Sequence, residues 1–323
     1  MTMTTFIDKE IVHLCVQLEN LVGIRTNNKL SLELIAIIDQ LTKYNTDLWH
    51  TLRHNRITSS TKLNQVANKI INDPKFDSQF ISDAMKHGLR YEHLCHIYIE
   101  AMFKSVVFYK PGLILHLTIP IFAATPDLLM IEAGKNKGVC ELKSVYKVFF
   151  SKPTPNNEIE FKEFILKHNY MSTKSCAKSL LFVPHTVNNT SLKPTDWCYG
   201  TSIAEANWSN CIVTVHTYDA ETEFKVSKPQ CSYTVNSITI NFKHQYLKQV
   251  LHQAFVLRSI SKEIETLYLF LLFCYDNVLV ETDTGELFYK PAMIVEIKIP
   301  YSTITDAMFN EYQSVYLSKL FNQ

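Results

Sequence analysis

Apolar residues recur at helical spacing over much of the first hundred residues. The spacing predicts helices over residues 7–22 and 31–44, and a third helix that begins near Thr46 or Asp47. A further helix, residues 87–104, has an apolar stripe on one side and polar residues on the other. We therefore expect a helical N-terminal region.

The pattern changes to strands after residue 105, in the segments "SVVFY", "LILHLTIPI", "DLLMIEA" and "VCELKSV". Residues 150–240 are irregular and contain five prolines, which suggests a long insertion on the core. A helix is expected over residues 242–259, a buried strand over 267–275 and a closing helix over 305–321. The order of elements predicts a mixed α/β protein.

Composition bounds the class of protein. The 323 residues are 46% hydrophobic and 20% charged, as in globular proteins with a sizeable core. A net charge of +1 neither supports nor excludes nucleic acid, because charge can be segregated by face. Eight cysteines without a CxxC pair argue against structural zinc. No secretory signal is visible and the longest apolar run is too short to span a bilayer, so we expect an intracellular protein without a membrane partner.

The stretch "TPDLLMIEAGKNKGVCELK" predicts a hairpin that places three charges in an apolar run. Strand side chains alternate between faces, so Glu141 and Lys143 point the same way, about 7 Å apart. If Ile131 pairs with Val139 across "EAGKNKG", Asp127 lies opposite Lys143 and joins the same patch. A slip by one residue would separate the three groups.

Two carboxylates and an ammonium on one patch suit a divalent metal. Mg²⁺ binds one or two carboxylates together with waters and substrate phosphate, and it lowers the pKa of a bound water. The lysine can orient or help to deprotonate that water. A solvated salt bridge at a strand edge has the same pattern, and a second Glu-x-Lys occurs at Glu296 and Lys298. The three charges alone therefore leave a metal site and a structural ion pair both open.

Further segments, taken in order, resemble the lambda-type exonuclease family. "LWHTLRHNRITSSTKLNQVANK" has Trp and Arg before Ile-Thr-x-Ser, "HGLRYEHLCHIYI" has Tyr-Glu in a helix, and "HQYLKQVLHQAFV" has glutamines four apart. With "TPDLL" and "CELK" between them, these motifs are similar to those of the YqaJ-like viral recombinase nucleases and the viral alkaline nucleases. The sequence departs from the family at Leu128, where glycine is usual, and at Ser144-Val145, where Cys-Pro is frequent.

The resemblance implies the PD-(D/E)xK restriction-endonuclease-like fold, an α/β (α+β) architecture with a central mixed β-sheet flanked by helices. Residues 1–45 would be a helical N-terminal extension and residues 46–323 the nuclease domain, with residues 150–240 inserted into it. Glu296 and Lys298 fall where the family has a plain core strand, so we interpret that pair as structural.

The resemblance also implies a catalytic set, which consists of Glu92, Asp127, Glu141, Lys143 and Gln249. The three carboxylates and the backbone carbonyl of Leu142 would bind the metal ions, and Lys143 would activate the attacking water. Gln249, assisted by Gln253, would support Lys143 and the water from the late helix. Taken without the family pattern, Glu92 could equally be a helix-surface residue.

Arg53, Ser60 and Gln253 form the implied nucleic-acid-binding set. Arg53 and Ser60 match the family positions that grip the phosphate at the 5′ end of the degraded strand, for which an arginine fork is well suited. Two structural interpretations stay open beside this one. Arg53 could stack on Trp49, and Ser60 could cap the following helix.

The function that follows is a Mg²⁺- or Mn²⁺-dependent deoxyribonuclease, with the family suggesting 5′-to-3′ exonuclease activity in recombination or viral genome processing. The alternatives are an RNase of the same fold and a catalytically inactive module that binds nucleic acid. DNA is the expected partner, with RNA as the alternative and a single-strand annealing protein as a further partner. The expected location is the host nucleus or cytoplasm, and the oligomeric state is left open.

Overall fold

The computed structural model describes residues 32–54, 56–59, 83–150, 154–169, 181–184, 211–220, 226, 228–236, 238–240, 244–282, 285–303, 309–310, 313–314 and 317. The helix expected over residues 7–22 lies outside this set, and too little of 305–321 is described to test the closing helix. Among the described residues, no helix combines the length and the apolar character needed to cross a membrane.

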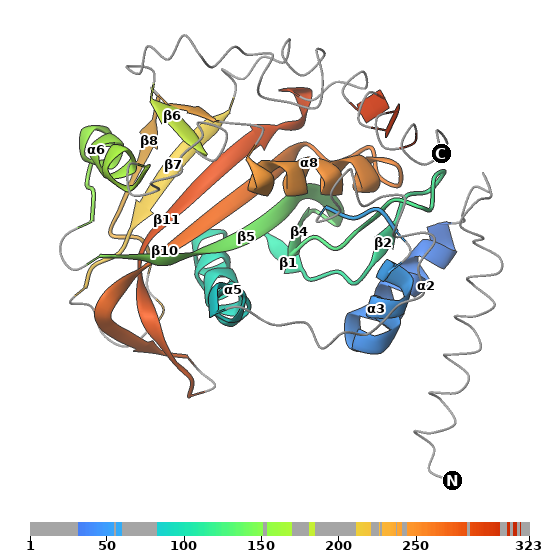
Figure 1. The fold of residues 1–323 in the computed structure, drawn as a ribbon, viewed down its shortest axis with the longest axis horizontal. Coiled ribbons are helices and arrows are strands. Elements are labelled where there is room, and N and C mark those ends of the chain that lie inside the picture. The colour runs from blue at the N-terminus through green and yellow to red at the C-terminus, as the bar shows by residue number, and fades with distance from the viewer. Residues whose placement is uncertain are drawn as a thin grey trace.

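A seven-stranded mixed sheet forms the centre of the molecule, in the order β1-β4-β5-β10-β11-β7-β8 (Figure 1). The strands are β1 (Val107–Tyr109), β4 (Leu128–Glu132), β5 (Lys135–Phe150), β7 (Ile212–Thr217), β8 (Cys231–Val235), β10 (Thr266–Glu281) and β11 (Leu287–Pro300). Only β5 and β10 pair in parallel, and the other neighbours are antiparallel. The predicted fold class, a mixed sheet flanked by helices, is confirmed.

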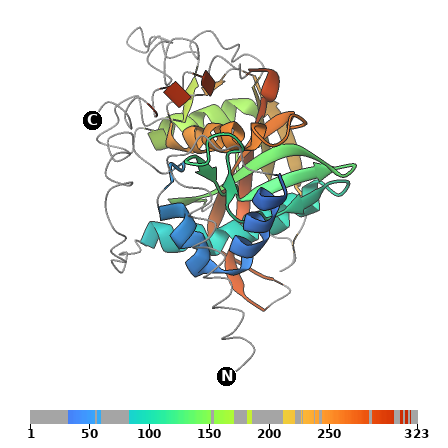
Figure 2. The ribbon, with the colours of Figure 1, turned by 90° about the vertical axis from the view of Figure 1, so that its right-hand side faces the viewer.

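Two long helices cover opposite faces of this sheet (Figures 1 and 2). One face of β5 packs Cys140 and Leu142 against α5 (Asp83–Met102), while Val139 on the other face joins the cluster that contains α8 (Gln245–Arg258). The predicted helix 87–104 is therefore α5, and the predicted helix 242–259 is α8. The central strands are buried on both faces, so the apolar run 267–275 is continuous rather than alternating.

The N-terminal helices are α2 (Leu32–Tyr44) and α3 (Thr46–His54), as the helical spacing predicts. Asp39 of α2 fixes the segment that follows β1, because its carboxylate accepts hydrogen bonds from Gly112 N at 2.6 Å and Tyr109 Oη at 2.8 Å. A Cβ at Gly112 would lie 2.3 Å from the Asp39 carbonyl oxygen, so only glycine allows this approach.

The strand expected over "LILHLTIPI" is largely absent. Only β2 (Ile114–Leu115) forms, paired with β3 (Ala123–Ala124). His116 ends the strand, because its Nδ1 accepts hydrogen bonds from the backbone N–H groups of Thr118 and Ile119 and bends the chain into a turn. Local side-chain bonding therefore overrides the apolar pattern.

The expected register of the charged hairpin is wrong by two residues. Leu129, not Ile131, pairs with Val139, and the ladder continues to Glu132 and Lys135 with a bulge after Met130. The turn is closed by two residues with positive φ, Ala133 and Gly134, as in type I′ hairpins, and not by the longer loop that we expected. Because side chains repeat every two residues, this shift leaves each charge on its predicted face.

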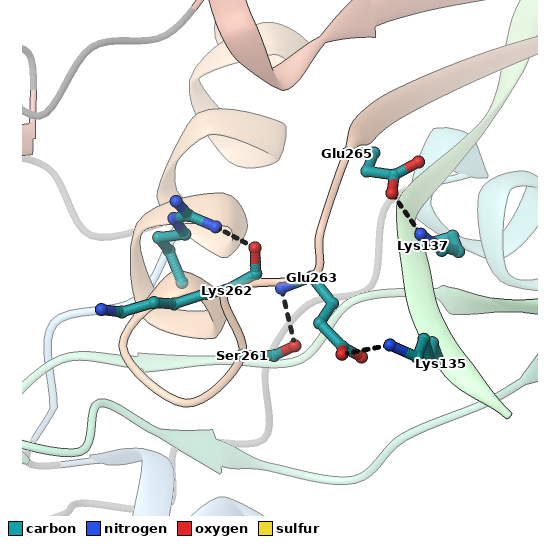
Figure 3. Close-up of polar contacts among 7 residues, drawn as sticks. Lys135, Lys137, Ser261, Lys262, Glu263 and Glu265 are labelled. Atoms are coloured by element: carbon teal, nitrogen blue, oxygen red, sulfur yellow. Dashed lines mark hydrogen bonds and ion pairs between the residues drawn. The ribbon is translucent and has the colours of Figure 1, made fainter.

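Ion pairs join the start of β5 to the loop between α8 and β10 (Figure 3). Lys135 Nζ lies 2.8 Å from the Glu263 carboxylate, and Lys137 pairs with Glu265. Exposed pairs of this kind contribute little to stability because solvent screens them, so they help to align the two parallel strands rather than to hold the fold.

The region from 150 to 240 contributes to the central sheet. Its strands β7 and β8 extend the sheet beyond β11, and β6 (Phe182–Pro184) pairs with β9 (Ile238–Ile240) in a small separate sheet. Helix α6 (Glu158–Asn169) contacts β8, where Asn236 N donates to the Glu158 carboxylate at 3.2 Å. A short 3₁₀ helix, Tyr301–Thr303, follows β11.

Candidate active site

Asp127 lies immediately before β4, where that strand begins beside β5. Since Leu128 pairs with Cys140, Asp127 lies level with Glu141 at the end of the ladder. Its Oδ2 accepts a hydrogen bond of 2.7 Å from Leu142 N. A carboxylate thus takes the place of a backbone carbonyl, and it is held against the strand that carries the other two charges.

Glu141 and Lys143 point to the α8 face of β5, as the alternation of strand side chains requires. Glu141 is 3% exposed, and the ammonium of Lys143 donates a hydrogen bond to its carboxylate. The ammonium also lies 5.7 Å from the centre of the Tyr246 ring on α8, within the range of a cation–π contact. All three charges are therefore gathered where they were predicted to be, with Asp127 beside Glu141 rather than opposite Lys143.

Burial and neighbouring charges shift the pKa values of the cluster. Burial and the charge of Glu141 raise the pKa of Asp127 well above its usual range, and the opposing effect of Lys143 is smaller. Burial also acts to lower the pKa of Lys143, but Glu141 and Asp127 outweigh it, and that pKa is raised. Two buried carboxyl groups beside one ammonium provide hard oxygen ligands, which suit a divalent cation.

Helix α8 contacts both carboxylate-bearing segments through consecutive residues. The Gln253 amide donates to the second carboxylate oxygen of Glu141, and Gln253 Oε1 is buried without a hydrogen-bond partner among the described residues. His252 is fully buried and donates from Nε2 to the Ala123 carbonyl at 2.8 Å, four residues before Asp127. In the described part of the chain no hydrogen bond joins Gln249 or Gln253 to Lys143, and the glutamine that contacts the cluster is Gln253, through Glu141.

Glu92 approaches the cluster from α5. It is close enough for its charge to raise the pKa of Asp127, but its carboxylate is paired with Lys110 Nζ at 2.9 Å. Within the described residues, no three His, Cys, Asp or Glu side chains converge as a metal site. The side chains that fit a cation in this arrangement are the two carboxylates Asp127 and Glu141.

Arg53, which lies on α3, is near enough to Glu141 for the two charges to interact. Its guanidinium stacks on Trp49 at 4.4 Å, and Trp49 Nε1 donates to Thr125 Oγ1 at 3.0 Å, two residues before Asp127. Burial lowers the pKa of Arg53, and the charge of Glu141 partly offsets this effect. Arg53 thus makes the structural stack that we considered and also lies near Glu141. Ser60, its predicted companion, is outside the described residues.

His252 and Lys110 were missed in the sequence. His252 had a signal, because it is a polar residue between the apolar pairs Val250-Leu251 and Ala254-Phe255 of a helix that is buried on almost every side. Lys110 had none, since its contact with Glu92 depends on how the chain after α5 folds back.

A statistical model of the viral alkaline exonuclease family matches residues 3–172. Among solved structures, a SOX–DNA complex is 13% identical, with a TM-score of 0.61 over 90% of this chain and 70% of that chain. A SOX–RNA complex from KSHV is 15% identical, with a TM-score of 0.58 over 90% of this chain and 75% of that chain. The shutoff and exonuclease protein of Kaposi's sarcoma-associated herpesvirus is 14% identical, with a TM-score of 0.56 over 90% of this chain and 73% of that chain. Identities this low establish a shared fold, and no protein with curated annotation matches the sequence.

Proposed function

Because the chain belongs to the viral alkaline exonuclease family, a family of DNA nucleases, we propose that it is a Mg²⁺- or Mn²⁺-dependent exonuclease that hydrolyses DNA. The observation that carries the proposal is the buried pair Asp127 and Glu141 beside Lys143 at the start of β4. A bound cation would neutralise charge on the scissile phosphate and lower the pKa of the attacking water.

Asp127 and Glu141 would hold the cation from two adjacent segments. The N–H and C=O of one strand residue point to the same neighbouring strand, so the Leu142 carbonyl points to the side on which its N–H meets Asp127. That carbonyl would add a third oxygen. Glu92 would complete the set once its carboxylate exchanges Lys110 for the cation.

Lys143 would orient the water and accept or release its proton. Its ammonium is held by Glu141 on one side and lies near the Tyr246 ring on the other, which fixes the position of Nζ. Gln253 would keep the Glu141 carboxylate in one orientation, as supporting residues around metal ligands commonly do. Gln249, one turn earlier on α8, would face the water or the nucleic acid.

Arg53 and Ser60 would bind the terminal 5′ phosphate and so set a 5′-to-3′ direction. Supporting this role, Arg53 is anchored on Trp49, which is itself tied to the segment that carries Asp127. A planar guanidinium held in this way is preorganised for bidentate contact with phosphate.

The proposed partner is duplex DNA, with RNA as a second candidate because similar SOX structures include both a DNA and an RNA complex. Backbone contacts dominate such binding, so affinity should fall steeply with salt. A single-strand annealing protein would bind the product strand. DNA degradation would take place in the host nucleus or cytoplasm.

The test measures degradation of linear duplex DNA, labelled separately at its 5′ and 3′ ends, with Mg²⁺, Mn²⁺ or EDTA. We expect metal-dependent release of nucleotides from the 5′ end, and a loss of about 10³-fold or more in the Asp127→Asn variant, which removes several kcal/mol of charge stabilisation. Asp276→Asn is the matched control. That acid is exposed on β10, so its substitution should leave the activity unchanged.

Equal activity in EDTA would contradict the metal requirement, and release from the 3′ end would contradict the direction. Binding of DNA without cleavage under every metal and pH condition would point to the inactive binding module. A matched RNA duplex, cleaved faster than the DNA, would make RNA the principal substrate.

A further inference from the structure

The hairpin formed by β10 and β11 extends beyond the rest of the sheet (Figure 1). The pairing of β5 with β10 ends at Phe150 and Tyr275, and the pairing of β7 with β11 ends at Thr217 and Met293. We call residues 276–289 the arm. Its described parts, residues 276–282 and 285–289, therefore continue β10 and β11 as a two-stranded ribbon with both outer edges outside the sheet.

Helix α5 closes the outer edge of the arm on the β11 side. Tyr289 N donates to Tyr91 Oη at 3.0 Å, and Arg90 Nη2 donates to the Leu287 carbonyl at 2.6 Å. Arg90 also lies over the Phe288 ring at 5.1 Å. One outward backbone group of each residue, the Leu287 carbonyl and the Tyr289 N–H, is thus bonded by a side chain of α5.

Among the residues that the structure describes, none covers the β10 edge of the arm in this way. Leu279 pairs with Tyr289 and Glu281 with Leu287. Residues directly opposite each other in an antiparallel ladder share their orientation, so the N–H and C=O of Leu279 and Glu281 point away from β11. No hydrogen bond to these groups is found within the described part of the chain. An open edge of this kind is a template for another strand.

The arm is apolar and acidic at the same time. Its sequence, "DNVLVETDTGELFY", contains four acidic residues and no lysine or arginine. Leu279, Leu287 and Tyr289 are 41%, 48% and 38% exposed and share one face with Glu281, while Val280 and Phe288 pack into the core on the α5 side. The exposed face can therefore bury apolar side chains, but it repels anions.

Charge decides what can occupy this edge. A nucleic-acid backbone would be repelled by the four acids. A second copy of the chain, paired edge to edge, would set the same acids against each other. A basic segment would gain both main-chain hydrogen bonds and charge complementarity. We propose that the β10 edge of the arm receives an extended, basic segment of a partner protein as an added strand.

The test uses the full-length protein and a fluorescent, end-blocked peptide of sequence Lys-Val-Lys-Thr-Lys-Val-Lys-Thr, with binding measured by anisotropy. We expect saturable binding that weakens with salt. Methylation of every second backbone nitrogen, on the side that faces β10, should weaken it about tenfold or more, because the charges remain while the hydrogen bonds are lost. The same peptide with Glu in place of Lys should not bind.

Variants of the arm locate the binding. Leu279→Pro removes an outward N–H that no ladder bond uses, so it is tolerated at an edge and should reduce affinity about tenfold. Leu279→Thr, its matched control, keeps the N–H and should stay within about threefold. Glu281→Lys acts on charge alone and should also weaken binding. Nuclease activity should be unchanged in all three, so failure here leaves the catalytic proposal untouched.

Equal affinity of wild type and Leu279→Pro, or equal affinity for the methylated peptide, would overturn the proposal. So would sedimentation that shows the arm holding two copies of the chain together, with Leu279→Pro dissociating them. Circular dichroism of each variant separates lost binding from lost folding, and the methylated peptide gives a result that needs no variant.

Discussion

Strands β5 and β11 carry the same short pattern in one sheet, Glu141-x-Lys143 and Glu296-x-Lys298, and the two sites have different chemistry. Both glutamates are buried, at 3% and 8% exposed. Glu141 accepts hydrogen bonds from Lys143 and Gln253, and it lies beside a second carboxylate, Asp127. Glu296 lies 3.1 Å from His216 of β7, whose other ring nitrogen is 2.9 Å from Ser232 Oγ.

The neighbouring strands explain the difference. β11 is paired on both sides along the whole stretch from Met293 to Lys298, so its backbone is closed to a substrate. β5 loses its neighbour where β4 begins, and the Asp127 side chain takes the free N–H of Leu142. A Glu-x-Lys pattern thus becomes a candidate metal site where an adjacent strand starts, because only there can a second acid and a phosphate approach it.

The largest expected difference between the two sites is the loss of activity when each lysine is replaced. Lys143→Met should lower the rate of DNA hydrolysis about 10³-fold, because it removes the proposed water-activating group. Lys298→Met should stay within about twofold. Single-turnover kinetics with Mg²⁺ and a linear duplex would measure both. A similar loss at both positions would break the distinction between the two sites.

Neutralising one acid of each site should change stability in opposite directions. Asp127→Asn keeps an oxygen that can accept from Leu142 N and removes a repelled buried charge, so in EDTA it should stabilise the protein by about 1–2 kcal/mol. Glu296→Gln weakens a charge-assisted contact with His216 and should destabilise it by about 1 kcal/mol. Urea unfolding measures both. Destabilisation by Asp127→Asn would show that Asp127 is structural in the metal-free protein.

The elements of this fold were largely predictable because their apolar spacing is strong. Helices α2, α5 and α8 and the buried strand β10 all follow from it. The hairpin register could not be predicted from apolar spacing, because it depends on a two-residue turn at Ala133 and Gly134 and on a bulge after Met130. The predicted grouping of the three charges was still correct, since a shift of two residues returns each side chain to the same face.

The contacts of the site were less predictable than its members. Two glutamines four apart on one helix are both candidates, and only the packing of α8 on β5 selects Gln253 for Glu141. The pairing of Glu92 with Lys110 likewise depends on tertiary structure. The implied roles of these residues in catalysis stay predictions.

The smallest expected effect is the pH dependence of the stability that Asp127 contributes. Burial and the charge of Glu141 raise the pKa of Asp127, so the folded, metal-free protein binds this proton more tightly than the unfolded chain does. Its stability should therefore rise as pH falls through the raised pKa, by at most about 1.4 kcal/mol per pH unit for one proton. Buried His116 acts in the opposite direction, since burial lowers its pKa to about 4 and protonation then favours unfolding.

The measurement is the free energy of unfolding as a function of pH, in EDTA. Subtracting the Asp127→Asn values from the wild-type values removes the effect of His116 and of every other shared group. The difference should favour wild type increasingly at low pH. A flat difference for Asp127→Asn would mean that the carboxylate is not strained by its neighbour, and the contrast between the two sites would then rest on hydrogen bonding alone.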